Sequence, residues 1–148
     1  MKKFLGHACF YRRFIKDFAK LAEPLSALLE KDALYIFNSE CVNAFEKLRS
    51  KLISAPILQP PDWSKPFEIM CDASDYALGA VLGQRDDENK LIAIHYASRL
   101  FTQKQKNLGV TEKEFLAIIF ACDKFKTYII DSKVIVHTDH RALRHLLV

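Results

Sequence analysis

The sequence predicts a mixed α/β fold in which a helical segment is followed by a sheet that combines strand directions. Apolar residues recur at helical spacing up to residue 53. From residue 66 the pattern changes to short alternating runs, separated by turns and by one long helical stretch. A meander of strands followed by a helix, a further strand and a final helix is typical of α+β or α/β layers.

The composition indicates one ordinary globular domain, or a domain with an appendage. The 148 residues are 50% hydrophobic and 27% charged, which provides for a buried core. No uninterrupted apolar run approaches the ~20 residues that span a bilayer. His7, Arg12 and Arg13 interrupt any signal-peptide core. We therefore expect an intracellular protein, in the cytoplasm or the nucleus, with no membrane partner.

The cysteines are isolated rather than paired in a Cys-x-x-Cys motif. Their neighbours are apolar, so we interpret all four as small core residues in a reducing compartment. They are Cys9, Cys41, Cys71 and Cys122.

A basic stripe marks the first predicted helix, which covers residues 4–22. The net charge is +4 with a pI near 8.9, and its excess lies in the first twenty residues. Like charges four residues apart destabilise a helix slightly, so the stripe is either a phosphate-facing surface or a solvated face. Its basic side chains are Arg12, Arg13, Lys16 and Lys20.

Two further helices and a connector complete the first part of the chain. Pro24 suits the first turn of a helix over Leu25–Glu30, and Asn38 or Ser39 is a suitable cap for the next one. Four prolines then fall within eleven residues, so residues 54–65 are predicted to be extended. This connector is expected to separate a domain at 1–53 from another at 66–148.

The second part begins with three predicted strands. Phe67–Asp72 alternates and ends in a carboxylate, Tyr76–Leu82 returns after a turn, and Leu91–Ser98 alternates again. Short turns between consecutive strands predict an antiparallel meander.

A polar loop over Thr102–Leu108 is expected next, followed by a long helix. Thr111 and Glu114 match the Thr-x-x-Glu capping box at its start. A strand over Lys133–Thr138 and a helix over Arg141–Val148 end the chain. The apolar stripe predicted to be buried on the long helix is Phe115, Ile118, Ile119, Cys122 and Phe125.

Three acids recur at strand ends and at the start of the long helix. Asp72 and Asp139 each follow a predicted strand, and Glu114 lies on the helix between them. Each has an ordinary alternative, as a turn former, an N-cap or a capping-box residue. Together they would repel one another unless a cation lay among them. Oxygen ligands favour Mg²⁺ or Mn²⁺ over zinc.

The three acids lie in the blocks CDAS (71–74), TEKEFLAI (111–118) and HTDHRAL (137–143). These blocks resemble the ribonuclease H domain in the Pol polyprotein of gypsy-type LTR retrotransposons. Upstream, three further blocks resemble the thumb and connection of the adjoining reverse transcriptase: FLGHACFYRRFIKDFA (4–19), AEPLSALLE (22–30) and SAPILQPPDWSKPF (54–67).

The resemblance implies an RNase H fold truncated before its last strand and helices, and hydrolysis of the RNA strand of RNA–DNA hybrids. Asp72, Glu114 and Asp139 match three of four metal-binding acids, with Glu112 as the fallback for Glu114. Two Mg²⁺ ions about 3.5–4 Å apart would activate water and stabilise the leaving oxygen. Ser74 would contact the RNA strand, and His140 and Arg141 would meet phosphate or serve only as a helix start.

The same resemblance implies that the fourth acid lies beyond Val148, so cleavage by this chain alone is expected to be impaired. Its partners would be the hybrid and the rest of the polyprotein: fingers, palm, the end of RNase H, and integrase. No polymerase site is expected, because the pair Asp86-Asp87 lacks apolar flanks. The alternatives are a non-catalytic nucleic-acid-binding or scaffold remnant, and a plain structural domain whose acids only cap helices.

Overall fold

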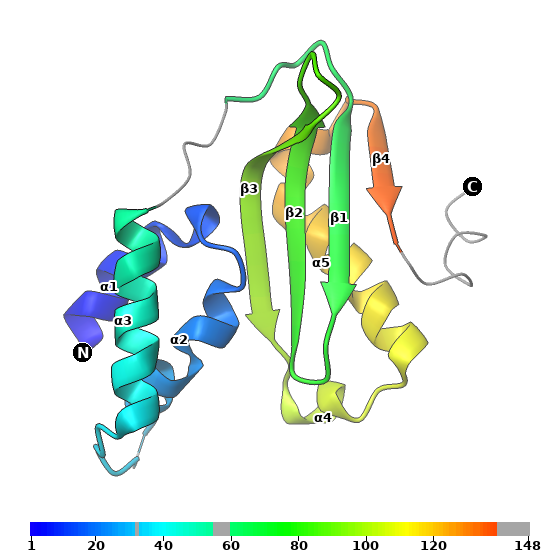
Figure 1. Ribbon diagram of the computed structural model, residues 1–148. Coiled ribbons are helices and arrows are strands. Elements are labelled where there is room, and N and C mark those ends of the chain that lie inside the picture. The colour runs from blue at the N-terminus through cyan, green and yellow to red at the C-terminus, as the bar shows by residue number, and fades with distance from the viewer. Residues whose placement is uncertain (32, 55–59, 139–148) are drawn as a thin grey trace.

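The computed structural model describes residues 1–31, 33–54 and 60–138, and shows a helical unit beside a sheet that carries one long helix (Figure 1). Its elements, in chain order, are α1 (Lys2–Phe10), the 3₁₀ helix η1 (Arg12–Phe14), α2 (Phe18–Ala27), α3 (Ser39–Ile53), β1 (Phe67–Ala73), β2 (Ala77–Arg85), β3 (Leu91–Leu100), α4 (Gln103–Lys106), α5 (Val110–Ile129) and β4 (Val134–His137).

The sheet has the strand order β3-β2-β1-β4. The first three strands form the predicted antiparallel meander, and β4 joins β1 in parallel, so the predicted mixed sheet is confirmed. Within the described ranges, no helix is long and apolar enough to cross a membrane.

The alternation predicted for the third strand is interrupted. Gly83 pairs with Ala93 and Leu82 with His95, which leaves Ile94 as an extra residue at a bulge. From His95 onward, alternate residues therefore face α5.

Helix α5 packs on one face of the sheet, against the apolar side of β1 and β2. Phe67 and Leu82 are fully buried there, together with Phe125 of the helix. The predicted helical stripe is partly wrong, because Phe115 and Ile119 are 42% and 50% exposed. Their places at the sheet are taken by Ala117 and Ala121, whose small side chains let the helix approach the strands closely.

The helix predicted over residues 4–22 is broken in the structure. Ile15 is extended, with φ −120°, and Asp17 adopts a left-handed conformation with φ 57°. The break lets Ile15 enter the core of the helical unit, where it is 2% exposed. Because α2 starts at Phe18, Pro24 lies inside that helix, and the predicted separate helix at Leu25–Glu30 is wrong.

The observed helix caps confirm the predicted start of one helix and reveal a short helix where a loop was predicted. Asn38 caps α3 as predicted, since its Oδ1 accepts a hydrogen bond from the Cys41 N–H at 3.0 Å. The segment predicted as a polar loop contains α4, which begins with a capping box between Thr102 and Gln105.

The cysteines differ in burial, contrary to the prediction that all four are core residues. Cys41 and Cys71 are buried and Cys122 is partly buried, whereas Cys9 is exposed on α1. Burial raises the pKa of the Cys122 thiol.

Two specific contacts tie the outlying segments to the sheet. The Ala19 N–H of α2 donates to Ser98 Oγ of β3 at 3.0 Å, which joins the helical unit to the sheet. The buried Gln84 side chain of β2 bonds both polar groups of the Asp62 backbone and the Lys65 carbonyl. The end of the connector is therefore fixed against the sheet.

Candidate active site

The candidate site lies where β1 ends. Asp72 is the penultimate residue of the strand and is exposed, on the face opposite α5. It pairs in register with Gly79 of β2. Because glycine has no side chain, the Asp17 carboxylate can approach this position, and its Oδ1 lies 3.6 Å from the place that a Gly79 Cβ would take.

Glu114 approaches the same strand end from the other face. Its side chain projects from the second turn of α5, is 6% exposed, and its Oε1 accepts a hydrogen bond from the Ala73 N–H at 3.3 Å. Beside it, Lys113 Nζ lies 3.5 Å from Asp75 Oδ1. These two contacts hold the start of α5 against the turn that follows Asp72.

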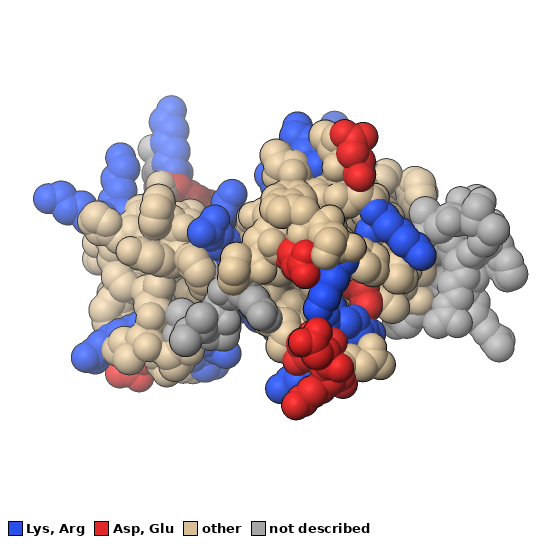
Figure 2. Space-filling model, turned by 90° about the horizontal axis from the view of Figure 1, so that it is seen from above, with Lys and Arg blue, Asp and Glu red and all other residues tan. Residues whose placement is uncertain are grey.

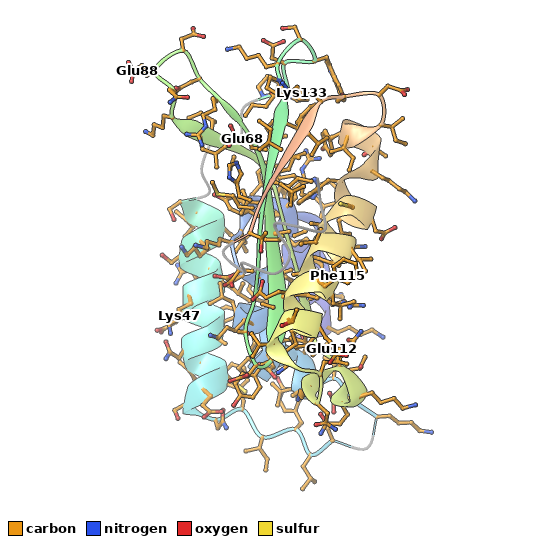
Figure 3. All side chains as sticks on the ribbon, turned by 90° about the vertical axis from the view of Figure 1, so that its right-hand side faces the viewer. Lys47, Glu68, Glu88, Glu112, Phe115 and Lys133 are labelled. Atoms are coloured by element: carbon orange, nitrogen blue, oxygen red, sulfur yellow. The ribbon has the colours of Figure 1, made fainter. Side chains whose placement is uncertain are left out.

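The capping box predicted at Thr111 is wrong. Gly109 is the N-cap of α5, and Glu112 Oε2 accepts a hydrogen bond from its N–H at 2.8 Å. Figure 3 shows Glu112 at the start of α5, one turn before Phe115. Glu112 therefore caps the helix, whereas Glu114 reaches the end of β1. A Thr-x-x-Glu match alone did not distinguish them, because Gly109 also has a glutamate three residues on.

Ser74 belongs to the turn between β1 and β2. Its hydroxyl donates to the Ala77 carbonyl at 3.0 Å and accepts from the Ala77 N–H at 3.1 Å. The side chain is exposed, so its position in the turn is fixed while one side stays open to solvent.

The third predicted acid, Asp139, lies outside the described residues, as do His140 and Arg141. Strand β4 ends at His137, which pairs with Met70 of β1, so the two parallel strands run toward the same edge and β1 continues for three residues beyond this pair. Among residues 1–31, 33–54 and 60–138, no three acidic, histidine or cysteine side chains gather around one point. Within that part of the chain, the predicted ligands brought to one strand end are Asp72 and Glu114.

The basic residues of the first segment separate because the predicted helix is broken. Lys16 and Lys20 line a groove of about 380 Å³ together with Asp72 and Ser74. Arg12 lines a different hollow, and the Arg13 guanidinium lies 5.0 Å from the centre of the Phe14 ring.

The groove also contains residues that the sequence did not single out. Tyr96 and Ser98 of β3 line it, as does Asp17. Period-2 alternation would have placed Tyr96 and Ser98 on one face, but the sequence gives no sign that α2 packs beside that face. Figure 2 shows Lys and Arg side chains projecting around the helical unit, whereas most of the acidic side chains in this view lie over the sheet.

Comparison with known proteins decides the family. The family described as "RNase H-like domain found in reverse transcriptase" matches residues 37–136. This chain belongs to that family. Its sequence relatives are polyproteins of transposons.

Relatives match almost the whole RNase H-like chain. It is 41% identical over 145 residues to the Retrovirus-related Pol polyprotein from transposon 412 of Drosophila melanogaster, covering 98% of this chain and 12% of that protein. Transposon Tf2-3 polyprotein of Schizosaccharomyces pombe is 35% identical over 147 residues, covering 97% and 11%. The chain thus spans about an eighth of these relatives' length.

Solved structures share the fold. A foamy viral protease-reverse transcriptase (dRH) in complex with double-stranded DNA matches with a TM-score of 0.84 at 22% identity, over 99% of this chain and 26% of that one. A foamy viral protease-reverse transcriptase in complex with RNA/DNA hybrid matches with a TM-score of 0.77 at 22% identity, over 97% and 20%. At this identity the likeness establishes the RNase H-like fold.

Proposed function

We propose that this RNase H-like domain hydrolyses the RNA strand of RNA–DNA hybrids, with Mg²⁺ or Mn²⁺ held by Asp72, Glu114 and Asp139. The observation that carries the proposal is that Asp72 and Glu114 both lie at the end of β1, where the N–H of Ala73, the residue after Asp72, donates to Glu114 Oε1 across 41 positions of sequence. Family membership and the order of the acids support it.

The donors present suit a hard divalent cation. Asp72 offers an exposed carboxylate, and Glu114 a buried one on the neighbouring element. Oxygen ligands of this kind are those that Mg²⁺ and Mn²⁺ prefer. When bound, the metal would activate water and stabilise charge at the leaving oxygen.

The chain's own residues would position the hybrid. Lys16 and Lys20 flank the groove that contains Asp72, so their ammonium groups would neutralise strand phosphates. Ser74, on the same groove, would bond a sugar 2′-hydroxyl and thereby select RNA over DNA. Tyr96 offers a ring for a base or sugar.

We further propose that the chain is organised as a reverse transcriptase thumb and connection segment over residues 1–53, a connector over 54–65 and the RNase H-like domain over 66–148. Separate apolar clusters in the helical unit and in the sheet support this division. The remaining parts of the polyprotein would be its physical partners.

The test is cleavage of an end-labelled RNA strand annealed to DNA, with and without Mg²⁺. The proteins are this chain, a version that continues past Val148 into the polyprotein, and Asp72→Asn in each. Asp123→Asn is the matched control, because it removes an exposed carboxylate of α5 that lies outside the groove. We expect cleavage that needs Mg²⁺, disappears in Asp72→Asn and persists in Asp123→Asn.

A non-catalytic role in binding nucleic acid is the second candidate, favoured by the lysines of the groove. It predicts hybrid binding without Mg²⁺ that is unchanged by Asp72→Asn. If the longer protein binds hybrid and leaves its RNA intact with either metal, the nuclease proposal is wrong and this one stands.

A further inference from the structure

A second hollow, of about 150 Å³, lies at the outer edge of β3, where η1 and α5 meet the strand. It is distinct from the groove of Asp72, although Tyr96, Ala97 and Ser98 of β3 line both hollows. Ser98 faces the groove and bonds Ala19, whereas His95 and Arg99 face α5, with rings of that helix as neighbours.

Three cations from three elements line this hollow, Arg12 of η1, Arg99 of β3 and Lys124 of α5, and none of its lining residues is acidic. The ion pairs found in the described part of the chain involve other basic residues. Gathering like charges without a counter-charge disfavours folding. A bound anion would remove that cost.

An aromatic ring holds two of these cations in place. The Arg99 Cζ lies 5.6 Å and the Lys124 Nζ 5.9 Å from the centre of the Phe120 ring, which favours both charges at this spot. Their positions are therefore set before any ligand arrives, which lowers the cost of ordering them on binding.

His95 lies on the inner side of the same hollow. Its ring packs against Phe125 and Tyr128, at 5.4 Å and 5.9 Å between centres. Its Nδ1 is buried without a hydrogen-bond partner in the described structure. Burial lowers the His95 pKa, and the charges of Arg13 and Arg12 lower it further. Because the charge of Arg12 acts on the His95 pKa, this ring would respond to an anion bound beside Arg12.

We propose that this hollow binds a phosphate group through Arg12, Arg99 and Lys124. The planar fork of an arginine matches the oxygens of phosphate, and two arginines with a lysine surround it from different sides. The volume equals that of about five waters, enough for one phosphate group. The ligand would be a phosphate of a nucleic-acid strand or a free phosphate, and this site does not depend on the proposed nuclease activity.

The experiment is an amide ¹H–¹⁵N NMR titration of this chain, in one arm with inorganic phosphate and in the other with a short oligothymidylate, against sodium chloride at equal ionic strength. We expect saturable shifts at Arg12, Arg99 and Lys124. The His95 pKa, followed through its ring signals, should rise when the anion is bound. Shifts with phosphate point to a free anion, and shifts with the oligonucleotide alone point to a strand.

Variants decide whether the hollow is responsible. Arg99→Gln and Lys124→Gln should each weaken binding about tenfold by removing one charge-assisted hydrogen bond. Lys126→Gln, exposed on the same helix and outside the hollow, should bind as the parent does. Lys124 is exposed, so its variant keeps the test valid if Arg99→Gln fails to fold. Absence of saturable shifts in both arms, or equal binding by Lys124→Gln, would overturn the proposal.

Discussion

His137 Nε2 lies 2.7 Å from Glu68 Oε2, so the last residue of β4 is bonded to a buried carboxylate of β1. Arg85 of β2 donates to both oxygens of Glu68, from Nε to Oε1 at 2.8 Å and from Nη2 to Oε2 at 3.0 Å. Figure 3 shows Glu68 on the face of the sheet away from α5. One carboxylate therefore links three strands, including the strand that leads to Asp139.

The Glu68 cluster predicts an acid-sensitive contribution to stability. The Arg85 hydrogen bond lowers the Glu68 pKa below its usual 4.5, with a further contribution from His137 and against the effect of burial. The unfolded chain therefore takes up this proton first, and the stabilisation is lost as the pH falls from about 4.5 through the folded pKa.

Glu68→Gln should lower the free energy of unfolding at pH 7 by about 1.5–3 kcal/mol. The lower end is expected because Arg85 and His137 are 39% and 42% exposed. Urea unfolding from pH 3 to 7 measures it, and the variant should depend less on pH than the parent. Glu88→Gln, exposed in the β2–β3 turn, is the control; an equal loss in both variants would contradict the prediction.

Alanine substitutions at Gly83 and Gly6 should change the free energy of unfolding in opposite directions. A Cβ on Gly83 would lie 2.7 Å from the Ile92 carbonyl oxygen, so backbone must move, whereas nothing lies within 4 Å of one on Gly6. We expect Gly83→Ala to destabilise by about 1–3 kcal/mol. Gly6→Ala, within α1, should stabilise by about 0.5–1 kcal/mol. Thermal unfolding measures both, and a stable Gly83→Ala would show that the bulge relaxes freely.

Glu112 and Glu114 of α5 should have different roles, Glu112 in capping the helix and Glu114 in binding metal. Glu112→Gln weakens only the bond to Gly109, which costs about 0.5–1 kcal/mol. It should leave Mg²⁺ affinity unchanged. Glu114→Gln should reduce Mg²⁺ affinity at least tenfold. Calorimetric titration with Mg²⁺ on both variants measures this, and the reverse order would make Glu112 the ligand.

Lys16 and Lys20 should contribute to hybrid affinity through charge alone. The double variant with glutamine should reduce the slope of log affinity against log salt by about 2, because each lysine would neutralise one phosphate. Lys2 and Lys3, exposed on α1, provide the matched double control. Fluorescence anisotropy across salt concentrations measures the slopes. Equal slopes for the two double variants would show that the groove does not contact the hybrid.

Local sequence patterns predicted the fold more fully than the site, because the site depends on contacts between residues that are far apart in the sequence. Alternation from Phe67 predicted the meander, and Asn38 predicted the start of α3. The break at Asp17 was not predictable, since its left-handed conformation serves to bury Ile15, a tertiary effect. Likewise, the choice between Glu112 and Glu114 depends on Gly109 being the cap. The hollow of Arg12, Arg99 and Lys124 joins positions whose proximity no sequence period signals.

Metal binding at the end of β1 is the central claim, and Mn²⁺ tests it most directly because it broadens nearby NMR signals. At substoichiometric Mn²⁺, the amide signals of Ala73, Ser74 and Glu114 should broaden first, and Asp72→Asn should abolish this. The rival site is the acidic turn at Asp86, Asp87 and Glu88. Broadening confined to that turn, or unchanged in Asp72→Asn, would contradict a metal site at the end of β1.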